Sequence, residues 1–274
     1  MKLGIINGWD EGNFRYVHDK GLEAVEFCVN HNYDADEFLA KAETIKSYSE
    51  KYNVAVGSMG RWGMIRIDDN GEIIPEALEA DKKVITAASI IGCPVYNCGV
   101  NYIDGKSFYE NCEIAIGYFK ALIDFAKDKN VKIAAYNCSW ENFVVEPKAW
   151  NYIMSALPEL GIKYDISHCL SRNGDYLQEM LDWGNRFYHF HLKGRVKING
   201  EDYDDAPAGL DMIQWPAVMD ILYTLDYEGM LSIEPHSHFW QGKRGQWGID
   251  YTINYFRPMV MPENYNFDDS PYMP

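Results

Sequence analysis

Strand-like and helix-like segments alternate through most of the 274-residue chain, and this alternation limits the folds open to it. Eight short segments rich in Val, Ile, Tyr and Phe are expected to be strands. Helix-length segments separate these strands, with a period of about 30 residues. The expected strands are residues 2–9, 22–30, 54–60, 93–100, 132–138, 161–168, 186–195 and 229–238. Because successive strands lack hairpin signals between them, the pattern predicts a closed parallel (β/α)8 barrel.

The main rival is an open, doubly wound sheet, which usually carries a G-x-G-x-x-G phosphate turn after its first strand. Residues 6–13 read INGWDEGN and do not match that motif. A (β/α)8 barrel fills a chain of this length as one domain. We therefore expect an α/β fold, a single-domain TIM barrel over residues 1–256, followed by an extended, proline-containing C-terminal tail over residues 257–274.

The helices between the strands are expected from apolar periodicity and from capping residues. Asp34 can cap one long helix, and Asn53 ends it. An Asn-Gly pair at Asn70 suggests a small hairpin in the segment before the third helix. The expected helices are residues 11–20, 35–52, 75–91, 108–129, 148–157, 175–183, 215–225 and 249–256.

Composition narrows the possible partners. The formal net charge of −16 opposes nucleic-acid binding, and no stretch of about 18 apolar residues suggests a membrane span. The six cysteines include no C-x-x-C pair, and the first residues lack the apolar run of a signal peptide. We therefore expect a cytoplasmic protein with reduced thiols in preference to a disulfide framework.

Three expected strands end in groups that can bind a hard cation or move a proton. They are residues 161–168, 186–195 and 229–238, and they carry Asp165, His191 and Glu234 near their C-terminal ends. Parallel strands of a barrel bring such groups together at one rim. Alternation within the strand turns His189 and His191 to the same side, and we expect His191 to lie nearer the mouth.

Each of these residues also has a purely structural explanation. Asp165 and His168 could cap a turn, and a histidine such as His191 often packs in a core with its hydrogen bonds satisfied. Glu234 follows apolar residues, where an unpaired carboxylate is costly to bury, and this favours a functional explanation. His236 and His238 follow the last strand and are surface loop residues by default.

Aromatic residues make up 15% of the chain, and several tryptophans, including Trp62 and Trp140, fall in or just before the expected loops. Indole rings in a cleft cover the apolar C–H faces of carbohydrates. The alternative is that they only pack the loops onto the barrel. Because no Gly-rich anion cradle is evident, we expect a neutral or keto sugar in preference to a sugar phosphate.

Four motifs in order resemble those of the sugar phosphate isomerase/epimerase superfamily, the xylose-isomerase-like TIM barrels that also include AP-endonuclease-like proteins. The resemblance covers the chain from the first strand to about residue 256. The motifs are YDISH at residues 164–168, HFHLKGR at residues 189–195, AGLDMIQW at residues 208–215 and SIEP at residues 232–235.

The resemblance implies a divalent metal ion (Mn, Mg, Zn or Co) that polarises a sugar carbonyl or hydroxyl, so that a neighbouring C–H can be deprotonated. Asp165, His191 and Glu234 would be its ligands, with Glu234 and His168 as catalytic residues. The resemblance also implies a possible homodimer or homotetramer. Together with the aromatic residues, it predicts a set of substrate-binding residues. They are Trp62, Tyr136, Asn137, Trp140, Lys193, Arg195 and His236.

The chain departs from the family at the end of the fifth strand. Tyr136 stands where the family usually has a glutamate that binds the metal and moves a proton. A phenol, with a pKa near 10, is a poor ligand for a hard dication. Either Asn137 or Glu141 fills the gap or a weaker metal is bound, or the site has lost its metal.

The expected function is an isomerase or epimerase that acts on a monosaccharide or keto sugar by metal-assisted proton transfer next to a carbonyl. A lyase or dehydratase of a keto sugar or inosose is the first alternative, because the same enediolate can expel a β-substituent when His168 or Tyr136 supplies a proton. The second alternative is a non-catalytic sugar-binding relative that has lost the metal.

Overall fold

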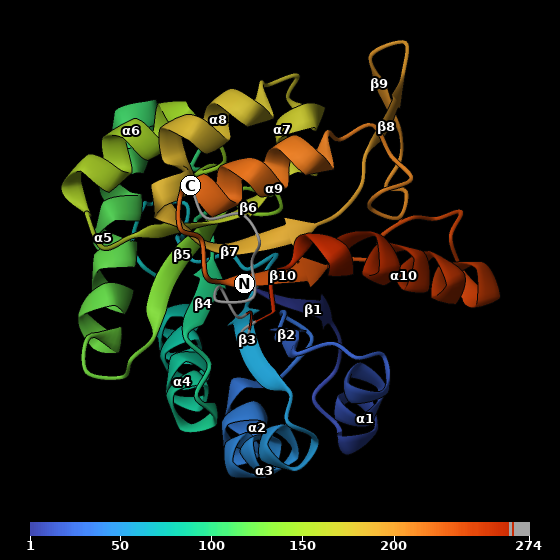
Figure 1. The fold of residues 1–274 in the computed structure, drawn as a ribbon. Coiled ribbons are helices and arrows are strands. Elements are labelled where there is room, and N and C mark those ends of the chain that lie inside the picture. Colours follow the sequence, from blue (N-terminus) through green and yellow to red (C-terminus); the bar gives the residue numbers. More distant parts are fainter. Residues whose placement is uncertain (263–264, 266–274) are drawn as a thin grey trace.

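The computed structural model, which describes residues 1–262 and Tyr265, is a closed barrel of eight parallel strands surrounded by helices (Figure 1). The predicted fold class is therefore confirmed. Around the barrel the order is β1, β10, β7, β6, β5, β4, β3, β2. The strands are β1 (Lys2–Ile6), β2 (Ala24–Cys28), β3 (Ala55–Gly60), β4 (Val95–Cys98), β5 (Lys132–Tyr136), β6 (Gly161–Asp165), β7 (Phe187–Leu192) and β10 (Met230–Ile233).

Helices follow the barrel strands and cover the outside of the barrel (Figure 1). Their starts show familiar capping chemistry: Ser107 and Glu110 form a capping box at the start of α5, and Asp34 caps α2. The helices are α1 (Glu11–Asp19), α2 (Ala35–Ala40), α3 (Ala42–Tyr52), α4 (Pro75–Ile91), α5 (Phe108–Ala126), α6 (Pro147–Ala156), α7 (Ile166–Ser171), α8 (Tyr176–Trp183), α9 (Trp215–Thr224) and α10 (Gly242–Phe256), with 3-10 turns η1 (Gly184–Arg186) and η2 (Arg257–Met259).

The observed elements differ from the sequence predictions at several boundaries. The helix expected over residues 35–52 is two helices, because the Lys41 N–H bonds to the carbonyls of Phe38 and Leu39 in a tighter turn. Strand β6 stops at Asp165, whose side chain accepts a hydrogen bond from the Ser167 N–H at 2.8 Å and starts α7. The last helix begins at Gly242 and is therefore longer than the predicted segment, residues 249–256.

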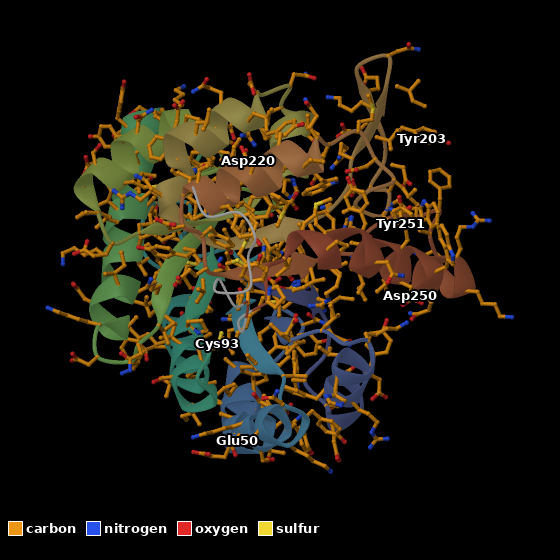
Figure 2. All side chains as sticks on the ribbon, in the orientation of Figure 1. Glu50, Cys93, Tyr203, Asp220, Asp250 and Tyr251 are labelled. Atoms are coloured by element: carbon orange, nitrogen blue, oxygen red, sulfur yellow. The ribbon has the colours of Figure 1, made fainter. Side chains whose placement is uncertain are left out.

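The loop after β7 contains an unpredicted hairpin, β8 (Val196–Ile198) and β9 (Glu201–Asp204). Its turn is the Asn199–Gly200 pair, and both residues have positive φ angles, 53° and 85°. This is the Asn-Gly turn that suits a tight hairpin. The hairpin projects from the barrel beside α10, and Tyr203 stands at its edge with 57% of its surface exposed (Figures 1 and 2).

The register of the barrel strands brings polar side chains to one rim. Asp165 pairs with His191, and His191 pairs with Ser232 on the other side. One pleat deeper, Lys163 pairs with His189 on one side and with Tyr136 on the other. Residues paired across parallel strands share a face of the sheet, so these groups surround one point inside the barrel.

A second group of buried charges lies outside the barrel sheet, where α4 and α5 pack on it. We call Arg61, Arg66, Asp81 and Tyr118 the Asp81 cluster. Asp81 accepts from Arg66 Nε at 2.8 Å, Arg61 Nη1 at 3.3 Å and the Tyr118 hydroxyl at 2.8 Å. All four side chains are buried, so neither arginine is available to an anionic substrate.

The tail prediction is only partly within the described residues: η2 and residues 260–262 continue the chain after α10. Residues 263–264 and 266–274 of the predicted extended tail lie outside them. Among the helices that the structure describes, none has the length and apolarity to cross a membrane.

Candidate functional site

A cavity of about 520 Å³ opens at the C-terminal ends of the strands, and its size is typical of small-molecule sites. Seven predicted site residues line it: Trp62, Trp140, His168, His191, Lys193, Glu234 and His236. The other residues on its wall are Ile6, Cys28, Asn30, Cys138, Lys163 and Pro235. The structure therefore brings most of the predicted site together at the barrel mouth.

His191 lies between two carboxylates. Its Nδ1 is 2.7 Å from Glu234 Oε2, and its Nε2 is 2.8 Å from Glu26 Oε2. Burial lowers the pKa of His191, but the charge of Glu26 and the hydrogen bonds to both carboxylates outweigh burial, so the pKa is raised. Both ring nitrogens are therefore placed to donate hydrogen bonds to carboxylates.

His189 lies deeper in the barrel, as predicted. It is fully buried, does not line the cavity, and its Nε2 is 2.8 Å from the same Glu26 oxygen. Its ring centre is 5.2 Å from that of His191, which confirms that the two side chains share the barrel interior. Glu26, from β2, thus holds both imidazoles in place.

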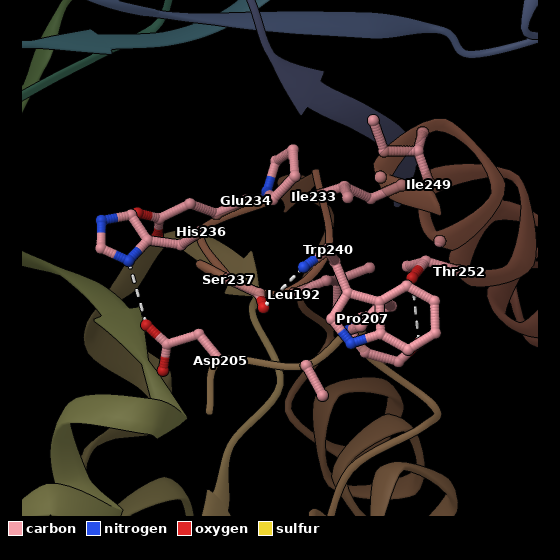
Figure 3. A pocket seen from close by; sticks show the side chains of 15 residues that line it. Leu192, Asp205, Pro207, Ile233, Glu234, His236, Ser237, Trp240, Ile249 and Thr252 are labelled. Atoms are coloured by element: carbon pink, nitrogen blue, oxygen red, sulfur yellow. Dashed lines mark hydrogen bonds and ion pairs between the residues drawn. The ribbon is translucent and has the colours of Figure 1, made fainter. Parts of the chain in front are cut away.

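Glu234 follows β10 and is the most accessible acid of the site, with 18% of its side chain exposed. Burial raises its pKa, but Lys193 and the hydrogen bond from His191 lower it well below its usual value. Figure 3 shows Glu234 beside His236, whose Nδ1 is 3.0 Å from Asp205 Oδ2. Glu234 is therefore a carboxylate on the cavity wall.

The two carboxylate oxygens of Asp165 differ in their hydrogen bonding. Its Oδ1 accepts from the Ser167 N–H, whereas its buried Oδ2 has no hydrogen-bond partner among the described residues. Four cationic or potentially cationic nitrogens face Oδ2 without reaching it: His168 Nε2 at 3.5 Å, Lys193 at 3.7 Å, His191 Nδ1 at 3.8 Å and Lys163 at 3.9 Å. Burial acts to raise the Asp165 pKa, but Lys193, His168 and Lys163 lower it below its usual value.

Two lysines supply positive charge to this rim. Lys193 Nζ is 3.7 Å from each of three carboxylate oxygens, those of Asp165, Asp205 and Glu234. Burial lowers its pKa, but these acids raise it above its usual value. Lys163, from β6, has a side chain only 2% exposed and still lines the cavity.

His168 stands on the first helical turn after β6, with 21% of its side chain exposed. Burial is the main cause that lowers its pKa to about 4, and the nearby ammonium groups add to this, although Asp165 opposes it. The imidazole is therefore neutral near pH 7. It faces the same cavity as Glu234 and can accept or relay a proton.

Aromatic side chains form one wall. Trp62 is 7% exposed and stacks on Tyr136 with ring centres 5.5 Å apart, and Trp140 is 46% exposed. The Tyr136 hydroxyl donates to the Trp140 carbonyl at 3.0 Å, and burial raises its pKa. The two indoles thus present an apolar surface to the cavity, and Tyr136 supports it from behind.

Three predicted substrate-binding residues are not on the cavity wall. Tyr136 lies behind Trp62. Asn137 bonds through both ends of its amide to the backbone of Asp165, at 3.0 and 2.9 Å. Arg195 pairs with Asp202 at 2.7 Å and with Asp205 at 2.9 Å. Asn137 and Arg195 therefore position neighbouring elements, and their predicted contact with a sugar stays a prediction.

A divalent ion fits the donor atoms by distance. One donor atom each from Asp165, His191 and Glu234 lie within 4.8 Å of one another, which confirms the predicted convergence. Neither proposed fourth ligand joins them, because Asn137 is committed to the backbone and Glu141 is exposed and off the cavity wall. The site therefore offers a hard dication three protein ligands at most.

The ion does not fit by charge. Lys193 and Lys163 already face Asp165, Lys193 also faces Glu234, and both His191 nitrogens are within hydrogen-bond distance of carboxylates. A dication placed there would meet two ammonium groups in a buried setting. We therefore assign no step of the reaction to a metal, and the ligand roles of the three residues stay a prediction.

Sequence reasoning missed two buried charges, Glu26 and Lys163. Both stand inside otherwise apolar strands, and a charge there is costly to bury unless it is paired. Lys163 also precedes Asp165 by two residues, and the period of two along a strand turns both side chains inward. These two signals were sufficient to place Lys163 in the site.

Comparisons with known proteins agree with the fold. Among curated proteins none matches the sequence. Solved structures match over 94% of this chain: 3-keto-D-glucoside 4-epimerase from E. coli (14% identity, 99% of that chain, TM-score 0.74), D-psicose 3-epimerase from Clostridium cellulolyticum H10 (12%, 99%, 0.73) and the probable 3-DHS dehydratase AsbF from Bacillus anthracis (11%, 99%, 0.73). At these identities the likeness shows the fold alone.

The sequence profile of one family, described as xylose isomerase-like TIM barrel, matches residues 14–254, which is most of the chain. The matched region runs from α1 almost to the end of α10 and so includes every predicted site residue. The protein therefore belongs to the xylose isomerase-like TIM barrel family.

Proposed function

We propose that this protein is an enzyme that isomerises or epimerises a monosaccharide or keto sugar by moving a proton next to a carbonyl. One observation carries the proposal: a carboxylate, Glu234, and a neutral imidazole, His168, line a single cavity of about 520 Å³. A base and a second proton carrier on one cavity wall are the groups that such a transfer needs. Two of the solved structures with a similar fold are sugar epimerases, which is consistent with this chemistry.

Glu234 is the proposed base. Its Oε2 is held by His191 at 2.7 Å, and its Oε1 lies 3.7 Å from Lys193, so the carboxylate is oriented without being enclosed. A positioned carboxylate can remove a proton from the carbon next to a carbonyl when the resulting oxyanion is stabilised. His168, which lines the same cavity, would then hold a proton or return one to the substrate.

Binding of the sugar is assigned to two kinds of group. Trp62 and Trp140 would cover the C–H face of the ring, while polar groups on the same wall, among them Glu234, would form hydrogen bonds with sugar hydroxyls. His236, which Asp205 orients at 3.0 Å, would contact the sugar at the cavity mouth. Such a combination suits a neutral ligand.

A dehydratase is the second candidate, since it needs the same proton abstraction followed by protonation of a leaving hydroxyl. His168 faces the cavity and could supply that proton, whereas the Tyr136 hydroxyl is occupied by the Trp140 carbonyl. A non-catalytic sugar-binding protein would use the same aromatic wall without proton transfer. A small sugar ligand, a cytoplasmic location, a homo-oligomer and the absence of a nucleic-acid partner remain predictions.

The test is exchange of carbon-bound hydrogen in D2O. The protein is incubated with D-fructose, D-tagatose and a 3-keto-glucoside, and deuterium next to the carbonyl is followed by NMR together with new sugars or dehydration products. We expect exchange with at least one sugar, and a loss of about 100-fold or more in Glu234→Gln with the fold intact.

The matched control is Glu159→Gln, which changes an exposed glutamate before β6, at the opposite end of the barrel. This variant should exchange hydrogen at the wild-type rate. Sugar binding without exchange in the wild-type protein would favour the non-catalytic alternative. An unchanged rate in Glu234→Gln would remove Glu234 from the mechanism.

A further inference from the structure

We propose that the ammonium groups of Lys163 and Lys193 take the place of a divalent metal ion, so that the cavity binds and polarises the oxygens of a keto sugar without a resident metal. This inference rests on the proposed function and names the groups that would act on the substrate oxygens. It starts from Lys163, a buried lysine that the family resemblance does not explain.

Lys163 is buried and yet lacks a close partner. Within the described residues its amine makes no hydrogen bond, and its ion pair with Asp165 Oδ2 is long, 3.9 Å. An ammonium group has three N–H donors, and burying it without acceptors is costly. Since Lys163 lines the cavity, a ligand with oxygen acceptors would supply the missing partners.

The position of Lys163 matches the loss of the expected acid. Tyr136 stands where the resemblance expects a glutamate, and its direct neighbour across the β5–β6 pairing is Lys163. Two adjacent positions of the barrel therefore lack the negative charge that the resemblance expects and carry the positive charge of Lys163. Both features lower the affinity of the rim for a dication.

The charges of the rim balance with both lysines charged. Asp165 faces Lys163 and Lys193 at 3.9 and 3.7 Å, and Glu234 faces Lys193 at 3.7 Å. Two ammonium groups thus supply two positive charges to these two carboxylates, as one divalent ion would, while Asp205, which also faces Lys193, pairs with Arg195 at 2.9 Å. The charge of Glu26 is not part of this balance, because Glu26 accepts hydrogen bonds from His189 and His191.

The spacing of these groups leaves hydrogen-bonding capacity unused beside the cavity. Lys193 stands 3.7 Å from three acids, too far for a good hydrogen bond to any of them, and Asp165 Oδ2 has no hydrogen-bond partner in the described chain. Both lysines line the cavity, so a carbonyl oxygen of a ligand bound there, with the neighbouring hydroxyl oxygen, would accept from the ammonium groups. Preorganised N–H donors stabilise the negative charge that develops on an enediolate oxygen.

The first test measures metal directly. The purified protein is treated with EDTA, and Mn²⁺ binding is followed by calorimetry and by the melting temperature. We expect a dissociation constant weaker than about 1 mM and no rise in melting temperature. Binding of one Mn²⁺ in the micromolar range would overturn the inference.

The second test restores a metal site. Lys163→Met removes one ammonium group, and the double variant Tyr136→Glu/Lys163→Met also returns the acid. We expect Mn²⁺ to bind the double variant about 100-fold or more tightly than wild type and to raise its melting temperature. The single variant should show a smaller gain in the same direction, and it carries the test if the double variant does not fold.

Lys132→Met, at the other end of the barrel, is the matched control, because it makes the same change in net charge on an exposed lysine. It should leave Mn²⁺ binding unchanged. If neither Lys163 variant gains affinity over wild type and this control, the ammonium groups are not what excludes the ion, and the inference fails.

Hydrogen exchange in D2O separates this inference from the proposed function. Exchange by the EDTA-treated wild type and by Lys132→Met, together with a loss of exchange in Lys163→Met, supports both proposals. Absence of exchange with every sugar, with or without Mn²⁺, would count against the proposed function. The metal titrations would still decide whether the lysines stand in place of the ion.

Discussion

The Asp81 cluster and the charged groups at the barrel mouth both gather buried carboxylates and cationic side chains, but they differ in how close the partners of Asp81 and of Asp165 Oδ2 lie. Asp81 has donors at 2.8, 2.8 and 3.3 Å, whereas Asp165 Oδ2 faces four nitrogens at 3.5 to 3.9 Å. Buried charges of a purely structural cluster satisfy one another. Charges that remain apart around a cavity are placed for a ligand, and stability and function should therefore respond in opposite ways in the two regions.

The largest effect is expected for Asp81→Asn. The substitution leaves the Arg61 and Arg66 guanidinium groups buried with no carboxylate to balance their charge, and breaking a buried pair in this way costs about 3–5 kcal/mol of unfolding free energy. Chemical denaturation measures the loss. Asp124→Asn, in an exposed pair with Lys120, should cost less than about 1 kcal/mol. Equal losses in the two variants would contradict the structural role of the Asp81 cluster.

The mouth should behave in the opposite way. His168→Gln keeps a polar side chain but removes the imidazole that faces the cavity. The rate of exchange of the sugar's carbon-bound hydrogen should therefore fall about 100-fold, while the denaturation midpoint of the protein changes little. His18→Gln, on the exposed face of α1, is the control and should change neither quantity. A large loss of stability in His168→Gln with unchanged exchange would reverse the distinction between the two regions.

Tyr118→Phe is expected to lower the unfolding free energy by about 1–2 kcal/mol. The hydroxyl of Tyr118 donates to Asp81 Oδ2 at 2.8 Å in a fully buried setting, so its removal leaves the carboxylate with one donor fewer. Tyr96→Phe supplies the contrast, because the buried Tyr96 hydroxyl has no hydrogen-bond partner in the part of the chain described. That variant should be neutral or stabilising by denaturation, and a matching loss in both would refute the hydrogen-bond explanation.

The sequence was a good guide to the barrel for physical reasons that are visible in particular elements. All eight strands were found because a buried parallel strand is a short apolar run, and the helix starts at Asp34 and Pro147 carried their own signals. The break between α2 and α3 was missed, since residues 35–52 keep one helical period across it. The β8–β9 hairpin was also missed, although Asn199–Gly200 marks its turn.

For the site, strand ends located Asp165, His191 and Glu234, because their position depends on topology alone. The hydrogen-bond partners of the site residues could not be predicted in the same way. Glu26 reaches His191 across 165 residues of chain, and Asn137 turns out to bind the Asp165 backbone instead of facing the cavity. Such contacts depend on side-chain direction and on the stagger between strands, which a single sequence does not contain.

The smallest effect on stability is expected at Asp211, which shares features with both regions. It accepts from Trp215 Nε1 at 2.8 Å, from the Arg195 N–H at 3.1 Å and from the Gly209 N–H at 3.2 Å. Burial nevertheless outweighs these donors and raises the pKa of Asp211 to about 6. Asp211 therefore combines the satisfied contacts of the Asp81 cluster with a proton affinity that burial has shifted.

The sign of the resulting pH dependence follows from that shift. Because the folded-state pKa of Asp211 lies above its value near 4 in the unfolded chain, the native state binds the proton more tightly. The stability contributed is complete below about pH 4 and is lost as the pH rises through about 6. Asp211→Asn loses one acceptor at every pH but also loses this dependence, so the free-energy difference between wild type and variant should shrink from pH 4.5 to 7. Urea denaturation at several pH values measures it, and a difference that grows with pH would show that the three donors, and not burial, dominate at Asp211.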